Sequence, residues 1–482
     1  MGSDPQFAKY PDLTLAQHIF TLANAPQTNQ PTSLTYLQNA IKDHKMAPLY
    51  RHLAHPTEGV LNAVGESTAQ PPQPPSKPLA RRASLVSSNL LPPKKPVPSG
   101  ILPWDESLYE ELKAANEKEL EQFQKEEEEA EKEAGETEIQ AARSKRAEFW
   151  ARVGDKDKAI AAYEKVFDKT GPLGTKIDIV LAIIRIGIFF NDKAFAKKQI
   201  ERASILVESG GDWDRRNRLK AYKGLHLLTV RSYNLAAPLL LDSLSTFTSY
   251  ELCSYSSLVV YAVLAGSLSL KRVDFKAKVV DAPEIKAILG DTEDKAEGGD
   301  EEMKDVSAST AERASGLVNV NALGTGGAVE SQTEAPVDVS SLGQLVNSLY
   351  TGNYRKFFLA LAAVEENFLT QDRYLYEHRA WFVREMRLRG YQQLLQSYRV
   401  VGLATMAQAF GVSVDFLDRD LAKFIAGGRV SCTIDRVQGT IETTRPDDKN
   451  KQYADVVKQG DALITKLQKY GQAVRLRGSE RA

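Results

Sequence analysis

Few residues of this chain could take part in metal or phosphate chemistry. None of the six histidines, at positions 18, 44, 52, 55, 226 and 378, forms the HxH or HExxH pattern that would place two imidazoles on one metal ion. His52 and His55 lie near one another, but no carboxylate or third ligand is suitably spaced, so we interpret both as surface residues. The stretch GTGG at 324–327 is not followed by the Lys-Ser or Lys-Thr pair of a phosphate-binding loop.

Nucleophilic and redox chemistry have equally little support. Cys253 and Cys432 form no CxxC pair, and neither has a histidine beside it in the sequence. No nucleophile elbow is present. We therefore interpret the chain as a non-enzyme with no cofactor and no metal site, whose function lies in its surfaces. Two isolated cysteines also fit a reducing compartment.

Composition limits the class of protein further. With 482 residues, the chain is long enough for two or three domains, and its net charge of −1 exerts no overall attraction on nucleic acids or anionic membranes. The first residues, MGSDPQFAKYPD, lack the features of a signal peptide. The longest apolar run, Ile177–Phe190, is interrupted by Asp178 and Arg185, so no membrane span is expected. We expect a soluble intracellular protein.

The last third of the chain contains a helix–turn–helix pattern. Apolar residues at helical spacing predict helices over 378–398 and 403–410. Ser413 is suited to cap a further helix, which Gly427 and Gly428 end. Two short strands with alternating apolar residues follow, over Val430–Asp435 and Thr440–Thr444. Two helices and a two-stranded wing predict a winged helix within a domain spanning 339–447.

The charges on this module argue against DNA or RNA. The second helix, 413–427, would enter the major groove, yet Arg419 and Lys423 are outnumbered by three aspartates, Asp415, Asp418 and Asp420. Nucleic-acid affinity comes largely from neutralising phosphates with Lys and Arg. Arg429 and Arg436 on the wing form only a weak basic footprint. We expect the module to pack against proteins and to bind no nucleic acid.

Residues 139–288 repeat a helical hairpin. A small residue follows each turn every 37 to 41 positions, at Ala159, Ala196, Ala236 and Ala277. The first copy, GDKDKAIAAYEKVF, is similar to the second helix of a tetratricopeptide repeat, and later copies are degenerate. Stacked hairpins bury one another's apolar faces and leave an extended surface for partners. The fold class is thus mostly α: a TPR-like solenoid, then a winged helix and a C-terminal helix.

The remaining segments differ sharply in composition. Residues 1–55 have helical patterning, and 56–103 are Pro-rich and expected to be disordered. Within the latter, Ser84 follows Arg81 and Arg82 as in a site for basophilic kinases, although we favour chance occurrence as the explanation of this pattern. Residues 104–138 predict an acidic helix, interpreted as a solvated helix with one buried stripe rather than a docking element. Residues 289–338 are Gly-rich and acidic, and we expect a disordered insert.

A terminal helix over 448–475 precedes a short tail at 476–482. Its apolar residues recur at alternating spacings of four and three, and further residues widen the stripe: Tyr453, Val456, Val457, Leu463, Ile464, Leu467, Tyr470 and Val474. Such a face must be buried against something. Two alternatives stay open: the helix packs on its own domain, or it joins helices of other chains in a bundle.

Helical repeats that end in a winged helix resemble the PCI domain shared by subunits of the proteasome lid, the COP9 signalosome and translation initiation factors. Longer blocks are similar to the family of the seventh non-ATPase regulatory subunit of the 26S proteasome. They are GGDWDRRNRLKAYKGL (210–225), STFTSYEL (245–252), WFVREMRLRGYQQLLQSYR (381–399), MAQAFGVSVDFLDRDLAKFIAGGR (406–429) and ETTRPDDKNKQY (442–453). KMAPLY (45–50) and the acidic helix also match. The Pro-rich segment and the 289–338 insert depart from the family pattern.

This resemblance implies a scaffold in ubiquitin-dependent protein degradation. In that family, winged helices of six subunits pair edge to edge, and their C-terminal helices gather in one bundle. The edge would come here from residues of the two wing strands: Val430, Cys432, Ile434, Thr440, Ile441 and Thr443. The implied partners are the other lid PCI subunits, the lid deubiquitinase heterodimer and the ATPase ring, in cytoplasm and nucleus. This chain lacks the histidine pair that the lid's metal-dependent deubiquitinase needs.

Two other assignments share the fold. A COP9 signalosome subunit would have the same architecture, although the DWDRRNRLK and TSYEL blocks argue against it. A translation or mRNA-export adaptor would share the winged helix but should bind RNA with an affinity that falls steeply as salt rises.

Overall fold

The computed structural model describes residues 7, 9–24, 30–56, 59–61, 102–133, 136–289, 339–443 and 448–479. Most of the Pro-rich segment with Ser84, nearly all of the 289–338 insert and the end of the tail lie outside the described residues. The chain divides into two compact units, Met1–Thr351 with Leu359–Val383, and Gly352–Phe358 with Arg384–Ala482.

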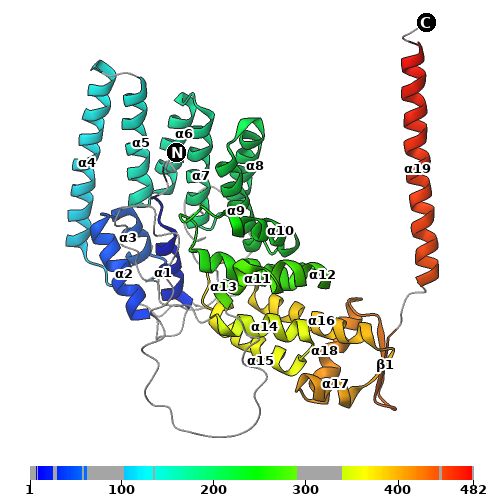
Figure 1. Ribbon diagram of the computed structural model, residues 1–482. Helices are drawn as coiled ribbons and strands as arrows, with labels where there is room; N and C mark the ends of the chain where they lie inside the picture. Colours follow the sequence, from blue (N-terminus) through cyan, green and yellow to red (C-terminus); the bar gives the residue numbers. More distant parts are fainter. Residues whose placement is uncertain are drawn as a thin grey trace, which may run out of the picture. The chain divides into compact units, whose positions relative to one another are not determined.

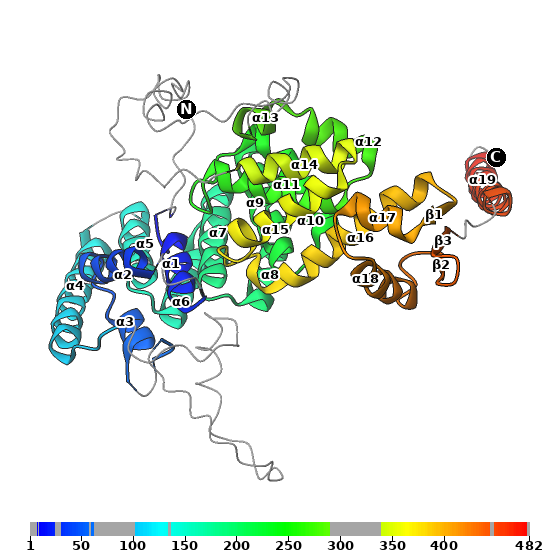
Figure 2. The same ribbon diagram turned by 90° about the horizontal axis from the view of Figure 1, so that it is seen from below.

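The first unit is entirely helical in its described parts (Figure 1). Before the repeats come four helices: α1 (Leu13–Asn24), α2 (Gln30–Asp43), α3 (Ala47–Ala54) and α4 (Glu106–Glu133). The helical hairpins follow: α5 (Glu136–Val153) with α6 (Lys156–Lys169), α7 (Leu173–Phe189) with α8 (Lys193–Gly210), α9 (Trp213–Thr229) with α10 (Tyr233–Ser243), and α11 (Tyr255–Ser269) with α12 (Arg272–Phe275). Figure 2 shows α7, α9 and α11 following one another through the unit.

The predicted hairpin repeat is confirmed in its first three copies. Asp155 and Asp192 cap α6 and α8, each accepting a hydrogen bond from the amide three residues later, at 3.2 and 3.0 Å. Ala159, Ala196 and Ala236 are each the fourth residue of the second helix and are at most 2% exposed. A small side chain there lets the two helices of a hairpin approach closely.

The fourth copy differs from the prediction at Ala277. Its second helix starts at Arg272 and passes into a π-helical turn, η4 (Lys276–Val280). The fourth position is therefore Phe275, which is 2% exposed, whereas Ala277 is exposed. The assignment of Ala277 as the equivalent residue is wrong, because small residues alone do not mark the start of a helix.

The predicted acidic helix, 104–138, corresponds to α4, and only its last residues belong to the next helix, since α4 ends at Glu133 and α5 begins at Glu136. The carboxylate of Glu127 accepts hydrogen bonds from Arg143 at 2.9 Å and Arg146 at 3.0 Å, both on α5. Part of the acidic face is thus neutralised inside the unit, which favours the interpretation as a helix with one packed stripe.

Further helices lead from the first unit into the second. They are α13 (Pro283–Leu289), α14 (Ser340–Thr351), α15 (Tyr354–Val364), the π turn η7 (Glu365–Leu369), the 3-10 turn η8 (Tyr376–His378) and α16 (Arg379–Ser397). Among the helices that the structure describes, none combines the length and apolarity needed to cross a membrane.

The second unit contains the predicted winged helix. Its elements are β1 (Val400–Gly402), α17 (Leu403–Phe410), α18 (Val414–Ala426), β2 (Cys432–Asp435) and β3 (Thr440–Thr443), with α19 (Asp448–Ser479) after them. Ser413 caps α18 as predicted, accepting a hydrogen bond from the Phe416 amide at 3.3 Å. Gly411 ends α17 with φ +69°, a conformation that glycine adopts without strain. The core joins α16, α17, α18 and the sheet around Tyr391, Phe410 and Leu417.

The predicted fold class is confirmed: helical hairpins, a winged helix and a long C-terminal helix.

Candidate assembly surfaces

The wing has three strands, in the order β1–β3–β2, where the sequence predicted two. In the central strand, Ile441 lies opposite Val401 of β1 on one side and Ile434 of β2 on the other. The prediction that Thr440–Thr444 supplies a pairing edge is therefore wrong. The backbone edges left to pair are the outer sides of β1 and β2, because β3 already uses both of its sides.

Side chains of the predicted edge residues mostly serve the core of the second unit. Val430, Cys432 and Ile441 are at most 8% exposed, and Ile434 packs against the same core. The Thr443 hydroxyl donates to the carbonyls of Tyr398 and Arg399, both at 3.1 Å. Of the two strands predicted to form the edge, β2 keeps a free backbone side for a partner, together with Thr433 on its exposed face.

Both wing arginines contact carboxylates. Arg436 donates to Asp418 on α18 at 2.8 Å. Arg429 donates to both oxygens of Glu385, at 3.1 and 2.5 Å. The third aspartate of α18, Asp420, is 6% exposed and accepts from the Tyr391 hydroxyl at 3.2 Å. The basic footprint is weaker than the sequence suggested, because these guanidinium groups already have carboxylate partners.

The apolar stripe of α19 is fully presented to solvent. Every described side chain of this helix, from 452 to 475, is exposed. The predicted stripe residues are between 54% and 75% exposed: Tyr453, Val456, Val457, Leu463, Ile464, Leu467, Tyr470 and Val474. They repeat every seven residues, as in Tyr453, Leu467 and Val474 around Gly460. Three stripe positions in each heptad form a face wider than the two-position seam of a paired coiled coil.

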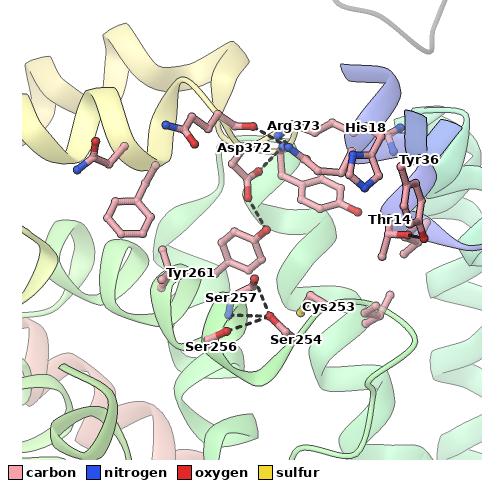
Figure 3. Close-up of a pocket in the computed structure, with 18 of the residues that line it drawn as sticks. Thr14, His18, Tyr36, Cys253, Ser254, Ser256, Ser257, Tyr261, Asp372 and Arg373 are labelled. Atoms are coloured by element: carbon pink, nitrogen blue, oxygen red, sulfur yellow. Dashed lines mark hydrogen bonds between the residues drawn. The ribbon is translucent and has the colours of Figure 1, made fainter. Parts of the chain in front are cut away.

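A cavity of about 820 Å³ lies in the first unit, and the sequence did not indicate it. Its walls come from α1 and α2, from residues 252–261, and from residues 367–374 (Figure 3). His18, Cys253 and Asp372 are among the polar and titratable side chains that line it. Because these segments lie far apart in the sequence, no local spacing could have placed them together.

The cavity shows no catalytic arrangement among its described residues. Asp372 accepts from the Tyr261 hydroxyl at 2.5 Å and from the Tyr374 amide at 2.6 Å, and burial raises the pKa of this carboxyl. His18 Nδ1 lies 3.1 Å from the Ser33 hydroxyl, and burial lowers the pKa of the imidazole. In Figure 3, Cys253 lies beside Ser254, apart from His18. Within the described residues, no group of three or more metal-binding side chains is present.

Three family models match successive parts of the chain. The first, 26S proteasome subunit RPN7, matches residues 105–278. The PCI domain matches 353–445, and the 26S proteasome regulatory subunit RPN7/PSMD6 C-terminal helix matches 452–474.

Curated relatives match along nearly the whole length. The chain is 36% identical to the 26S proteasome regulatory subunit rpn7 of Schizosaccharomyces pombe, covering 97% of each chain. It is 37% identical to RPN7 of Saccharomyces cerevisiae, covering 99% of this chain and 96% of the relative. The chain belongs to the RPN7/PSMD6 family. A third member, the 26S proteasome non-ATPase regulatory subunit 6 of Dictyostelium discoideum, is 34% identical over 98% of this chain and 100% of its own. The family thus carries the number seven in the yeasts and six in Dictyostelium.

The family matches coincide with the surfaces described above. The RPN7/PSMD6 C-terminal helix covers the apolar stripe from Tyr453 to Val474. The PCI match covers α16, α17, α18 and the three-stranded wing. A COP9 signalosome complex subunit 1 of Arabidopsis thaliana is 22% identical over 59% of this chain and 53% of its own length, a far more distant likeness than to the RPN7/PSMD6 members.

Proposed function

We propose that this chain is a non-catalytic scaffold subunit in the lid of the 26S proteasome regulatory particle, acting in ubiquitin-dependent protein degradation. It assembles with the other lid PCI subunits, and through them it positions the lid deubiquitinase heterodimer against the ATPase ring. Its contribution is structural and lies in the surfaces of α19 and of the wing. A content of two cysteines without a CxxC motif fits a reducing compartment, and we place the chain in cytoplasm and nucleus.

The apolar face of α19 is the observation that carries this proposal. A helix of 32 residues is about 48 Å long, and covering an apolar stripe that runs along it removes that surface from water, which is favourable. The stripe residues occupy three of seven heptad positions, so they can contact more than one neighbouring helix. Helices of several subunits in a bundle would cover it.

The outer edge of β2 provides a second contact. Cys432–Asp435 bond to β3 on one side, and the backbone groups on the other side remain for a strand of a neighbouring subunit. The corresponding edge of β1 is only three residues long, Val400–Gly402. We therefore expect β2 to form the longer of the two edge contacts.

Affinity purification followed by mass spectrometry tests the assignment. The full chain and a truncation ending at Asp447 would each carry an N-terminal tag. We expect the full chain to bring down a complete lid with ATPase-ring subunits, and the truncation to bring down an incomplete lid. Unchanged partners for the truncation would contradict the role of α19.

The same experiment separates the alternatives. Recovery of signalosome subunits would assign the chain to the COP9 assembly, a subunit of which is similar to this chain at 22% identity. Recovery of ribosome-associated or mRNA-export proteins would favour an RNA-associated PCI adaptor, against the carboxylate contacts of Arg429 and Arg436.

A further inference from the structure

The apolar stripe of α19 is interrupted by two glycines. Gly460 occupies the position of the seven-residue repeat that Leu467 and Val474 share, and Gly471 occupies the position of Val457. A glycine inside a helix is destabilising relative to alanine, so its presence needs a reason. A Cβ at either glycine would meet nothing within 4 Å, so no contact among the described residues supplies that reason. Each glycine leaves a gap in the exposed stripe, and we term these gaps the Gly460 notch and the Gly471 notch.

A second copy of α19 that runs antiparallel to the first would fill both notches. In an antiparallel helix pair, the two seam positions of one helix face those of the other in opposite order. With Leu463 of one copy against Leu467 of the other, the remaining pairs follow from the sequence: Gly460 with Tyr470, Val456 with Val474, and Gly471 with Val457. Each glycine then faces a larger side chain, and the twofold symmetry of the pair makes each of these contacts twice.

A parallel pair of the same helices would not fill the notches. In that arrangement each seam residue faces its own counterpart, so Gly460 would face Gly460 and Tyr470 would face Tyr470. Two gaps would meet at one level of the pair and two rings would compete for space at another. The stripe therefore favours the antiparallel arrangement.

The charges of α19 favour the same arrangement. Between residues 452 and 475, both acidic residues, Asp455 and Asp461, lie in the first half of the helix, whereas Lys466, Lys469 and Arg475 lie in the second half, which has no acidic residue. All of these side chains are exposed. An antiparallel copy places each acidic half beside a basic half, and a parallel copy places like charges together.

The stripe exposes enough apolar surface for such a pair. Its eight large apolar side chains, from Tyr453 to Val474, are between 54% and 75% exposed. At this exposure, side chains of their size present on the order of 100 Å² each. Together they reach about the 800 Å² per partner that a specific interface buries. A pair of helices covers much of this area, which is compatible with association at micromolar concentration.

We propose that two copies of the unassembled chain pair through α19 in antiparallel orientation, with Tyr470 of each copy in the Gly460 notch of the other. The pair removes the stripe from water while the chain is outside the lid, and it competes with the helices of other subunits for the same face. Because the pair forms only at micromolar concentration, the dilute chain is monomeric. This self-association goes beyond the scaffold function and does not depend on it.

Analytical ultracentrifugation of the full chain tests this proposal. Between about 1 and 100 μM, we expect the mass to rise from that of one chain, 53.3 kDa, towards twice that value. Gly460→Tyr should weaken the association at least tenfold, because two rings would compete for the notch. Tyr470→Gly should do the same, because it leaves the notch empty. The matched control is Ala462→Tyr, which adds the same ring on the opposite face of the helix and should behave as the unaltered chain.

Mixing the two variants tests the register of the pair. Neither variant should pair well with itself, but an equimolar mixture of Gly460→Tyr and Tyr470→Gly should regain the association of the unaltered chain. In the mixed pair, each ring of the first variant faces a glycine of the second. If Tyr470→Gly lowers the helix content measured by circular dichroism, Tyr470→Ala takes its place in both experiments.

Two outcomes would overturn the proposal. One is an unaltered chain that stays monomeric up to about 100 μM. The other is association of the Gly460→Tyr chain as strong as that of the unaltered chain, which would exclude the Gly460 notch from the contact. Either result leaves the scaffold function untouched, since that function is judged by the recovery of lid subunits. Conversely, a chain that pairs with itself but recovers no lid subunits would refute the scaffold function alone.

Discussion

Glu385 of α16 and Arg429, which lies between α18 and β2, form a two-point ion pair with hydrogen bonds of 3.1 and 2.5 Å. Glu385 is 7% exposed, while the Arg429 side chain is half exposed. The hydrogen bonds that Arg429 donates to the Glu385 carboxylate raise the pKa of the guanidinium. The ion pair holds the loop after α18 against α16, the helix that precedes the wing.

Removing the carboxylate should loosen the second unit. We expect Glu385→Ala to lower the free energy of local opening by about 1–3 kcal/mol, because the geometry is bidentate and the carboxylate is buried. Hydrogen exchange of the α16 and α18 amides measures this change. Glu442→Gln, on the exposed face of β3, is the control and should change the opening free energy by less than about 0.5 kcal/mol. Unchanged exchange in Glu385→Ala would mean that the pair is not stabilising.

A charge in the α19 stripe should impair assembly and leave the fold intact. Ile464 is 54% exposed, so Ile464→Asp should not alter the thermal unfolding of the isolated chain. In a bundle the carboxylate introduced at position 464 would be buried without a partner. We therefore expect affinity purification with the Ile464→Asp chain to recover severalfold less of the lid subunits. Ala462→Asp introduces the same charge on the opposite face of the helix and is the matched control. If both variants recover equal amounts of lid subunits, the stripe does not lie in the interface.

Nucleic-acid binding should be weak and unspecific. Because Arg429 and Arg436 contact carboxylates, few cations of the wing are available to release counterions from phosphates. We expect no submicromolar binding of single-stranded RNA or duplex DNA in anisotropy titrations at 50 mM salt. Submicromolar affinity that falls steeply between 50 and 200 mM salt would contradict the scaffold-only function.

Acid should weaken the packing of α4 on α5 through Glu127. Burial alone would raise its pKa, but hydrogen bonds and charges from Arg143 and Arg146 outweigh it, so the pKa of Glu127 lies below its usual value of 4.5. A carboxyl with a lowered pKa contributes stability above pH 4.5, and this contribution is lost as the pH falls through the folded-state pKa. Glu127→Gln should therefore cost up to about 1 kcal/mol at pH 7 and flatten the loss of stability below pH 4.5.

Thermal unfolding between pH 7 and pH 3 measures that contribution. Glu121→Gln, at an exposed position of α4, serves as the control and should preserve the original pH profile. A Glu127→Gln profile identical to that of the unaltered chain would show that its ion pairs are not stabilising.

Close helix packing in the third hairpin should make Gly224 sensitive to any side chain. A Cβ at this position would lie 2.7 Å from Cδ2 and 2.9 Å from Cγ of Leu240, closer than carbon atoms approach. Gly224→Ala should therefore destabilise the chain by about 1–3 kcal/mol in urea denaturation, despite the better helix propensity of alanine. Gly471→Ala, where a Cβ would meet nothing within 4 Å, should leave stability unchanged or raise it by up to about 1 kcal/mol. A stabilising Gly224→Ala would contradict the close approach of α9 and α10.

The sequence alone determined those features that depend on neighbours within a few turns of helix. The Ser413 cap lies three residues before the amide that it accepts from, and the stripe of α19 repeats every seven residues, so both are visible as local spacing. The hairpin repeat was predictable for the same reason. Longer sequence blocks supported the family assignment that the comparisons then established.

Only the tertiary structure decided the features that depend on residues far apart in the chain. Val400–Gly402 is too short to be recognised as a strand, and it becomes one because β3, about 40 residues later, pairs with it. Phe275 takes the place expected for Ala277 because packing selects the buried position, not the residue type. Arg185 and Phe7 meet across 178 positions of sequence. Local periodicity does not reveal such pairs, because the two residues interact favourably only after the helices that carry them have packed together.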